Sequence, residues 1–316
     1  MYKEVQFRGA GEMSADCVIS VRFFRLSASL QPYFTALYST TITCEPGQVV
    51  EDYLHPEWAA LRFTEGTPPS GIVGPGEPEP RWPFVANGPT SKAIRFRVTQ
   101  SRVWGLGLQP AGWAKFLDIP ASDLANTLVD GSKHPAYARI APLLGKVMDA
   151  NGDADEIPQR INEHLLEIAD REVPNEELIV ACQETLRDPD VAGVAELGAR
   201  LDIAPRSLER LCRRYFGFPP KLLLRRQRFL RSLAQFMLDP TLTWAGALDN
   251  QYHDQAQFVR DFRSFMGLTP RRYAALPHPI LEPIMQQRMA DQGAAPQRVD
   301  LPTIMRYQAH RDPGGA

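Results

Sequence analysis

The sequence predicts an α+β chain with a β-rich barrel at the N-terminus, helices after it, and an all-helical region at the C-terminus. Three observations predict this order. β-branched and aromatic residues form short runs between residues 18 and 108, apolar residues recur every three to four positions from residue 120 onward, and one helical pattern occurs twice, fifty residues apart. We expect domains at 1–118 and 189–276, a helical connector at 119–188 and a C-terminal tail at 277–316.

Composition places the chain among soluble proteins with a real core. Its 316 residues are 44% hydrophobic and 23% charged, and this length corresponds to about two domains. No uncharged apolar run approaches the roughly 18 residues of a membrane-spanning helix, and Met1–Glu4 begins neither a signal nor a transit peptide, so we expect a cytoplasmic protein with no membrane partner. The four cysteines lie far apart without a CxxC pair, which predicts neither a disulfide framework nor a zinc ribbon.

Charge is distributed unevenly along the chain. Residues 189–276 contain 14 Lys and Arg against 8 Asp and Glu (+6), whereas residues 1–188 contain 17 against 25 (−8). A basic third joined to an acidic remainder suggests that the basic part meets a polyanion, although a chance surface imbalance gives the same numbers.

The N-terminal unit has the pattern of short strands. The runs Cys17–Phe24, Leu37–Thr43, Ala93–Val98 and Val103–Leu108 alternate or are rich in β-formers. Between them, 12 of the 24 residues of segment 66–89 are Gly or Pro, so long regular elements cannot persist there. A compact sheet or barrel of roughly 100 residues is the simplest architecture.

Helical periodicity begins near residue 120. Apolar residues of 140–147, 157–168 and 178–186 each form one face of a helix, and Asp188-Pro189-Asp190 breaks the chain after them. After Pro277, repeated Pro and Gly with few apolar residues predict a loosely held tail.

An internal repeat is the most informative feature. Sliding residues 208–221 forward by fifty positions gives 258–271, with four of fourteen residues identical. The identical pairs are Arg210/Arg260, Arg213/Arg263, Gly217/Gly267 and Pro220/Pro270. The apolar spacing is kept as well, which indicates a structural repeat.

Each copy encodes two short helices joined by a tight turn. In the first, an amphipathic helix at 194–201 leads into Asp202–Ala204, Pro205 suits the first position of the next helix, and Gly217 ends it. The second copy has its first helix at Leu242–Leu248, and Asp254 can cap a helix that ends at Gly267. Both are helix-turn-helix units.

The segment between the copies predicts a connecting helix. Lys221–Leu238 spans about 27 Å at 1.5 Å per residue, with Leu222, Phe229, Leu230, Leu233 and Met237 toward the core. We expect Lys221, Arg225, Arg228 and Arg231 on its exposed side. Successive major grooves on one face of B-DNA are about 34 Å apart, so two helices held at that distance could enter adjacent grooves.

The exposed faces of the two second helices carry side chains suited to DNA. Arginine can bond guanine or clamp phosphate, glutamate can accept from cytosine, and glutamine matches adenine. The expected DNA-binding residues are Arg206, Glu209, Arg210, Arg213 and Arg214 in the first copy, and Gln255, Gln257, Arg260 and Arg263 in the second. An ordinary solvated helix face is the alternative interpretation of the same residues.

Residues 191–276 resemble the DNA-binding domain of the AraC family of bacterial transcription regulators. The residues that carry the resemblance are Ala204–Arg210, Tyr215–Gly217, Tyr252–Phe262 and Phe265–Tyr273. The resemblance implies two helix-turn-helix units joined by a long helix, with base or backbone roles for Arg206, Glu209, Arg210, Gln255, Gln257 and Arg260. The chain departs from the family pattern at Gly246-Ala247, at Gln251 and at Gln257, where relatives often carry His.

A weaker resemblance covers the N-terminal half. Gly105–Trp113 and Phe116–Pro120 are similar to the β-rich sensor half of one branch of AraC-type regulators, which implies a cupin-like barrel that senses a small-molecule effector or mediates association. A homodimer and a contact with RNA polymerase stay open, as does activation versus repression.

The sequence contains no recognisable catalytic machinery. The six histidines show no HxH or HExxH spacing, and GxSxG and Walker motifs are missing, so we expect no enzyme, no catalytic residues, no metal site and no cofactor. Trp58, Trp82, Trp104 and Trp113 could line an apolar pocket, but core packing is the simpler use. Two other classes stay open: a small-molecule-binding protein or enzyme with a structural helical half, and a protein-interaction module.

Overall fold

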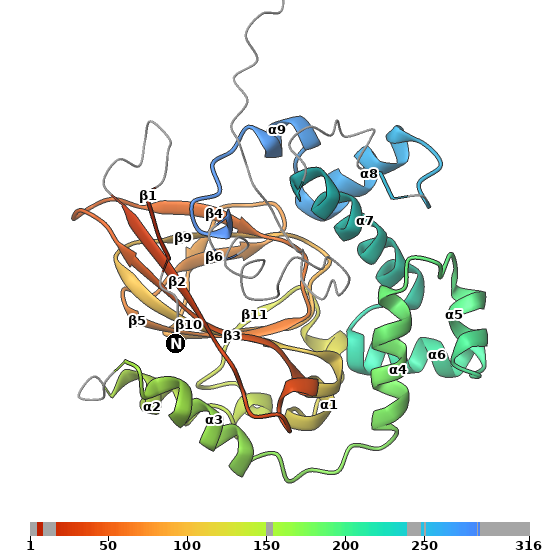
Figure 1. The fold of residues 1–316 in the computed structure, drawn as a ribbon, viewed down its shortest axis with the longest axis horizontal. Coiled ribbons are helices and arrows are strands. Elements are labelled where there is room, and N and C mark those ends of the chain that lie inside the picture. Colours follow the sequence, from red (N-terminus) through yellow and green to blue (C-terminus); the bar gives the residue numbers. More distant parts are fainter. Residues whose placement is uncertain are drawn as a thin grey trace, which may run out of the picture.

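The computed structural model describes residues 5–8, 17–149, 154–238, 248–249, 251–282 and 284. It confirms the predicted fold class: two antiparallel sheets and the helices packed against them make up the N-terminal region, and helices make up the C-terminal region (Figure 1). Among the described residues, no helix is both long enough and apolar enough to cross a membrane.

The larger sheet has seven strands and the smaller has four. The order in the first is β1 (Val5–Arg8), β2 (Val18–Phe24), β3 (Phe34–Thr43), β10 (Ser101–Leu108), β5 (Ala59–Gly66), β8 (Phe84–Asn87) and β11 (Leu128–Asp130). The order in the second is β4 (Val50–Leu54), β9 (Ile94–Val98), β6 (Ser70–Val73) and β7 (Glu79–Pro80). The strands within the segment rich in Gly and Pro are short, as its composition predicts.

Residues of the larger sheet alternate between two environments. Leu61 and Phe63 of β5 join a core cluster with helical residues such as Ile161, whereas Arg62 and Thr64 face the smaller sheet across a cavity. Because successive side chains of a strand point to opposite faces, this sheet separates a helix-covered layer from a barrel interior.

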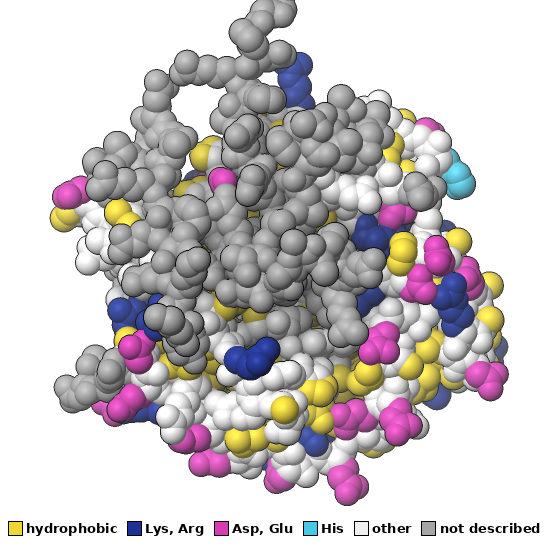
Figure 2. Space-filling view, viewed as in Figure 1, with side chains coloured by type: hydrophobic (Ala, Val, Ile, Leu, Met, Phe, Trp, Pro, Cys, Tyr) yellow, Lys and Arg dark blue, Asp and Glu magenta, His cyan; other side chains and the backbone are white. Residues whose placement is uncertain are grey.

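Short helices cover the outer face of the larger sheet. They are η1 (Gln31–Tyr33), α1 (Pro110–Phe116), η2 (Ala121–Leu124), η3 (Pro135–Tyr137), α2 (Leu143–Met148) and α3 (Ile157–Glu167). Helix α4 (Glu176–Arg187) instead packs Ile179, Cys182 and Leu186 against the C-terminal helices. Figure 2 shows acidic side chains along the lower edge of the molecule. At the right it shows both signs of charge around α5 (Val194–Arg200), α6 (Pro205–Leu211) and α7 (Pro220–Leu238).

The Gly105-x-Gly107 motif in β10 has a packing role. A Cβ atom on Gly105 would lie 2.1 Å from the Tyr38 ring, which crosses the strand at the paired position. Glycine at this position therefore makes room for Tyr38.

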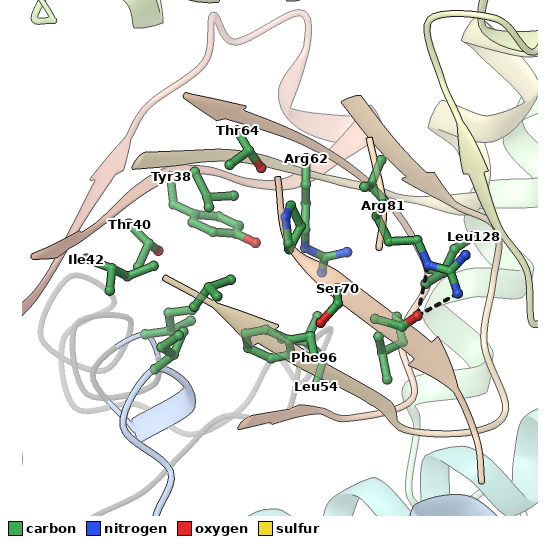
Figure 3. A pocket seen from close by; sticks show the side chains of 18 residues that line it. Tyr38, Thr40, Ile42, Leu54, Arg62, Thr64, Ser70, Arg81, Phe96 and Leu128 are labelled. Atoms are coloured by element: carbon green, nitrogen blue, oxygen red, sulfur yellow. Dashed lines mark hydrogen bonds between the residues drawn. The ribbon is translucent and has the colours of Figure 1, made fainter. Parts of the chain in front are cut away.

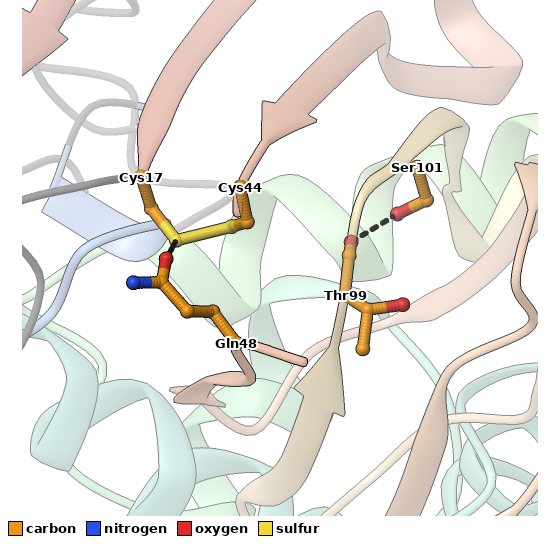
Figure 4. Close-up of a disulfide and its surroundings, with 5 residues drawn as sticks. All are labelled: Cys17, Cys44, Gln48, Thr99 and Ser101. Carbon is orange, nitrogen blue, oxygen red and sulfur yellow. Dashed lines mark hydrogen bonds between the residues drawn. A yellow bond between two sulfur atoms is a disulfide. The ribbon is translucent and has the colours of Figure 1, made fainter. Parts of the chain in front are cut away.

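One cysteine pair forms a disulfide, which the sequence analysis did not predict when it expected no disulfide framework. Cys17 precedes β2 and Cys44 follows β3, and the two form a disulfide beside Gln48 (Figure 4). They are 27 residues apart in sequence, but antiparallel pairing of Val18 with Thr43 places them opposite each other. Spacing along the chain did not reveal this because the strand register was unknown. Cys182 and Cys212 are buried free thiols.

Candidate nucleic-acid interface

The first helix-turn-helix unit forms where the sequence predicts it. Helix α5 (Val194–Arg200) leads through a turn into α6 (Pro205–Leu211), which continues as a π-helical turn at Cys212–Phe216. Asp202 adopts the left-handed conformation within the turn, and Pro205 occupies the start of α6. Gly217 ends the unit in the left-handed conformation, with φ of 81°.

The apolar face of this unit holds α6 in place. Leu208, Cys212 and Phe216 are completely buried, in one cluster with Leu197 of α5 and Trp58 of the barrel. The face opposite this cluster is open to solvent: Arg206, Arg210, Arg213 and Arg214 are exposed and Glu209 is half-buried.

Contacts within α6 and the π-helical turn that continues it distinguish the exposed side chains from one another. The Arg213 Nε donates to Glu209 Oε1 at 2.8 Å, and the Arg214 guanidinium lies 5.6 Å from the Tyr215 ring centre. Arg206 and Arg210 make no ion pair with any residue that the structure describes. These two arginines are therefore the freest donors on the helix.

The second unit presents a similar helix. Helix α8 (Gln255–Met266) begins after Asp254, whose carboxylate accepts from the Gln257 backbone N–H at 2.6 Å, and it ends at the left-handed Gly267, as predicted. Its exposed polar side chains are Gln255, Arg260 and Arg263, and Gln257 is half-buried. The Gln257 side-chain oxygen accepts from the His253 N–H at 3.3 Å, which orients that amide.

The first helix of the second unit, expected at Leu242–Leu248, lies outside the described residues except for Leu248. Leu248 packs beside the cluster of Phe229, Tyr252, Phe258 and Phe262. The departures from the family pattern at Gly246 and Ala247 also lie outside the described residues.

Helix α7 (Pro220–Leu238) joins the two units as predicted, but its arginines do not all face solvent. Arg225 pairs with Asp261 at 2.5 Å, and Arg228 lies 3.5 Å from the same carboxylate and 4.5 Å from the Tyr252 ring centre. Arg231 pairs with Asp249 at 2.5 Å. The predicted exposed stripe is therefore wrong for these arginines, because α8 and the turn before it pack against this side of α7 and supply carboxylates; Lys221 is exposed as expected.

Arg226 anchors α7 to the barrel and was missed by sequence reasoning. It is 1% exposed, its guanidinium lies 3.9 Å from the Trp58 ring centre, and its Nη1 donates to the carbonyl oxygens of Thr90 at 2.8 Å and Glu57 at 3.2 Å. Burial lowers the pKa of Arg226 to about 9. Its position three residues after the buried Leu223 and four before Leu230 was the available signal, since that spacing places it on the core face.

The second unit also contacts the barrel directly. The Ala93 N–H donates to the Phe265 carbonyl at 2.7 Å, and His55 Nε2 lies 2.6 Å from the Tyr273 hydroxyl of α9 (Pro270–Ala274). The barrel thus packs against the buried sides of both units and leaves the outer surfaces of α6 and α8 accessible (Figure 1).

Comparison with known proteins identifies this region. Residues 197–275 match a family described as "Helix-turn-helix domain". This segment is an AraC-type helix-turn-helix domain. The match begins in α5 and ends just after α9, so the helix-turn-helix domain includes both second helices and α7 between them.

Solved structures of AraC-like regulators are similar to the chain at low identity. The AraC-like transcriptional activator CuxR is 12% identical, with 73% of this chain and 87% of CuxR covered and a TM-score of 0.33. ToxT from Vibrio cholerae O395 is 10% identical, with 72% and 96% covered and a TM-score of 0.36. The same protein bound to (E)-4-(8-methylnaphthalen-1-yl)but-3-enoic acid is 9% identical, with 72% and 97% covered and a TM-score of 0.40. No curated protein matches the sequence.

Among the described residues, no cluster of three or more His, Cys, Asp and Glu side chains is arranged to hold a metal ion. Three of the four tryptophans that could have lined a pocket, Trp58, Trp104 and Trp113, are instead buried in core clusters.

Proposed function

We propose that this chain is a sequence-specific transcription regulator whose helices α6 and α8 enter successive major grooves of one DNA duplex. The observation that carries the proposal is the two-sided character of both helices within the helix-turn-helix domain. Their apolar faces are buried, and all nine predicted DNA-binding side chains are exposed or half-buried on the other side.

Helix α7 supplies a suitable separation. Its 19 residues correspond to about 28 Å, close to the roughly 34 Å between successive major grooves on one face of B-DNA. Arg226 and the Asp261 ion pairs fix α7 to the barrel and to α8, so the two reading helices are held before DNA arrives. Such preorganisation lowers the entropy cost of binding.

The exposed side chains divide by chemistry. Arg210 and Arg206 are free to bond guanine or phosphate, and Gln255 offers the paired donor and acceptor that adenine matches. Glu209 is paired with Arg213, and this pair must open if the carboxylate is to accept from cytosine. Arg260 of α8 is exposed and could bond guanine in the second groove, as Arg210 could in the first. Phosphate contacts by the other arginines, including Arg214 and Arg263, would supply most of the affinity.

The N-terminal region is proposed to be the sensing or association half, with the domain limits 1–118, 119–188, 189–276 and 277–316. Support comes from the barrel cavity and from the close packing of the barrel on the DNA-binding half. A small molecule, a second copy of the chain and RNA polymerase are the partners that such a half could serve.

Arg210→Ala tests the base-reading role. Affinities for a duplex selected from a random pool, for each of its single-base-pair variants and for a random duplex should be measured by anisotropy at one salt concentration. We expect a loss of about 1–3 kcal/mol on the selected duplex, a smaller loss on the random one, and relaxed preference at one base pair.

Arg139→Ala is the matched control, because Arg139 is an exposed arginine of the N-terminal region that pairs with Asp170. It should leave both affinities unchanged. Equal losses on specific and random duplexes for Arg210→Ala would leave only a phosphate contact for that residue. A full chain that selects no sequence would overturn the proposed function.

A further inference from the structure

Two loops of the barrel contact the helix-turn-helix domain along its length. Residues 55–58 connect β4 to β5, and residues 88–93 connect β8 to β9. The loops are hydrogen-bonded to each other, because the Glu57 N–H donates to Thr90 Oγ1 at 3.0 Å and the Thr90 N–H donates to the Glu57 carbonyl oxygen at 2.9 Å. We call these two loops together the brace.

Arg62 of β5 holds the brace from inside the barrel. Its guanidinium donates to Glu57 Oε1 at 2.7 Å and to Asn87 Oδ1 at 2.5 Å, so it links the first loop to the residue before the second. Figure 3 shows Arg62 among the side chains that line the space between the two sheets. Arg62 and Glu57 are largely buried, so salt screens their ion pair little, and both loops are tied to the sheet.

The brace contacts the first helix-turn-helix unit where its second helix ends. The Trp58 ring packs edge-on against Phe216, with 5.7 Å between ring centres. Pro89 lies beside Gly217, where an added Cβ atom would come within 3.0 Å of Pro89 Cγ. One residue from each loop therefore meets the end of the π-helical turn that continues α6, and α6 cannot shift against the brace without breaking these contacts.

The same loops contact the middle of α7. Arg226 bonds to one carbonyl oxygen of each loop, that of Glu57 in the first and that of Thr90 in the second. Because the guanidinium is buried, moving α7 away from the brace would leave a buried charge without these acceptors.

Both loops also contact the second unit. From the first loop, His55 Nε2 lies 2.6 Å from the Tyr273 hydroxyl of α9. From the second loop, Lys92 Nζ donates to the Ser264 carbonyl oxygen in the last turn of α8 at 2.5 Å, and the Ala93 N–H donates to the next carbonyl oxygen at 2.7 Å. The end of α8 is thus held by two hydrogen bonds from the barrel.

The chain after α9 adds a further attachment, which corrects the expectation that it is loosely held directly after Pro277. Ile280 and Leu281 are buried, and their N–H groups donate to Asp52 Oδ2 of β4 at 2.9 Å and 2.7 Å. His278 Nδ1 lies 3.0 Å from Asp52 Oδ1. Sequence reasoning missed this contact because the segment has few apolar residues, and the carboxylate that binds Ile280 lies 228 positions earlier.

The two reading helices are therefore connected twice. Helix α7 joins them along the chain, and the brace joins them again through the barrel (Figure 1). A helix of this length bends gently when only its own hydrogen bonds restrain it. A second connection restrains the bending of α7 and the rotation of α8 about it, so the distance and angle between α6 and α8 depend on the barrel as well as on α7.

We propose that the brace sets the spacing between the two half-sites that the chain accepts on DNA, with His55 and Lys92 as positioning residues for α8. This inference rests on the proposed function and adds to it a role for the N-terminal region in specificity. One inserted base pair moves the second groove by about 3.4 Å and turns it by about 35° around the duplex. Two helices held by the brace cannot follow that displacement, whereas two helices joined by α7 alone follow it in part.

The test compares the unaltered full chain with a double variant, Lys92→Met with His55→Leu. The two substitutions remove two side-chain hydrogen bonds between the brace and the second unit and leave the predicted DNA-binding residues unchanged. The matched control is Lys133→Met with His134→Leu, a lysine and a histidine whose ion pair and ring contact both lie within the N-terminal region. Tyr273→Phe is a second variant, which removes the His55 bond from the side of α9 without altering the barrel.

Affinities are measured for a duplex selected by the full chain and for duplexes with one base pair inserted or removed between its half-sites. We expect either change to weaken binding of the unaltered chain and of the control about 10- to 100-fold, the effect of losing one good base contact. In the double variant this spacing penalty should be about 3- to 10-fold smaller, the range of one or two neutral hydrogen bonds, and Tyr273→Phe should change it in the same direction. Partial unfolding lowers all three affinities by one factor, so it leaves the penalty unchanged.

Two results overturn the proposal. Equal spacing penalties in the unaltered chain and in both brace variants would show that α7 alone sets the spacing, and an unaltered chain that is indifferent to spacing would show that no spacing is set. In both cases the chain still selects a sequence, so the proposed function stands.

A measurement without DNA separates the brace from the proposed function. Spin labels at Arg213→Cys and Arg263→Cys, equivalent positions of the repeat, report the distance between the two units, because the free thiols of Cys182 and Cys212 are buried. In the double brace variant the distance distribution should broaden by about 3 Å, the displacement that one inserted base pair demands. Equal widths in the variant and the unaltered chain would overturn the brace even where a DNA sequence is selected, and the expected broadening would support its restraint of the helices even where none is.

Discussion

His55 makes the docking of the helix-turn-helix domain on the barrel sensitive to pH. This side chain is 3% exposed, its Nε2 lies 2.6 Å from the Tyr273 hydroxyl, and its Nδ1 has no partner among the described residues. Burial, reinforced by the neighbouring His278, lowers the pKa of His55 from an ordinary 6.5 to about 3. The ring therefore stays neutral in the folded protein at pH values where an unfolded chain is protonated.

The sign and size of the effect follow from this pKa. Since the unfolded chain takes up the proton first, stability falls as the pH drops below about 6.5, and the loss continues until the pH reaches about 3. One pKa unit corresponds to about 1.36 kcal/mol, so acidification from pH 8 to pH 5 should remove about 2 kcal/mol through His55 alone.

Urea unfolding of the unaltered protein and of His55→Gln at pH 8, 7, 6 and 5 isolates this contribution. Glutamine does not titrate, so the difference in unfolding free energy between the two proteins should change by about 2 kcal/mol between pH 8 and pH 5, with the unaltered protein losing more. His253→Gln, at an exposed position of the helix-turn-helix domain, controls for the loss of a histidine as such. Parallel pH profiles for the unaltered protein and His55→Gln would refute the reasoning.

Two further substitutions test the contacts that hold the reading helices. Gly217→Ala should cost about 2–4 kcal/mol, because a left-handed position disfavours any Cβ and this one would lie 3.0 Å from Pro89 Cγ and 3.2 Å from the Ala121 carbonyl oxygen. Gly267 is also left-handed but has open space around it, so Gly267→Ala should cost only about 1–2 kcal/mol. Equal losses of stability for Gly217→Ala and Gly267→Ala in thermal unfolding would contradict the role given to the close contacts of Gly217. Asp261→Asn should lower the free energy of unfolding in urea by about 2–4 kcal/mol, because Asp261 is buried and pairs with Arg225 and Arg228. The control is Glu156→Gln, which removes an exposed carboxylate that pairs with Arg160 and should change the free energy of unfolding by no more than about 0.5 kcal/mol. A similarly small loss for Asp261→Asn would disprove a structural role for its ion pairs.

The features that sequence reasoning predicted correctly are encoded locally. Pro205 begins α6, Asp254 caps α8, and Gly217 and Gly267 end their helices in the left-handed conformation. Each depends only on residues within a few positions, because caps and helix ends are decided by the backbone N–H and C=O groups nearest to them. Strands such as residues 101–108 are likewise visible in the sequence, because side chains along a strand alternate between its two faces with a period of two residues.

The features that sequence reasoning missed depend on residues far apart in the chain. Asp52 and His278 are separated by 226 positions in the sequence, and the two cysteines of the disulfide, Cys17 and Cys44, by 27 positions. Arg226 contacts the barrel at Trp58 and Thr90, and a helical pattern alone does not say which partner will cover a charged residue on the core face. The cavity exists only because two sheets meet, so no single segment indicates it.

The central claim is that α6 and α8 read adjacent major grooves on one face of the duplex. Methylation interference at guanine N7, carried out on a duplex selected by the full chain, tests it most directly. The account predicts two clusters of interfering positions about 10–10.5 base pairs apart, one lost selectively in Arg210→Ala and the other in Arg260→Ala. A single cluster, two clusters on opposite faces, or one cluster lost in both variants would contradict it.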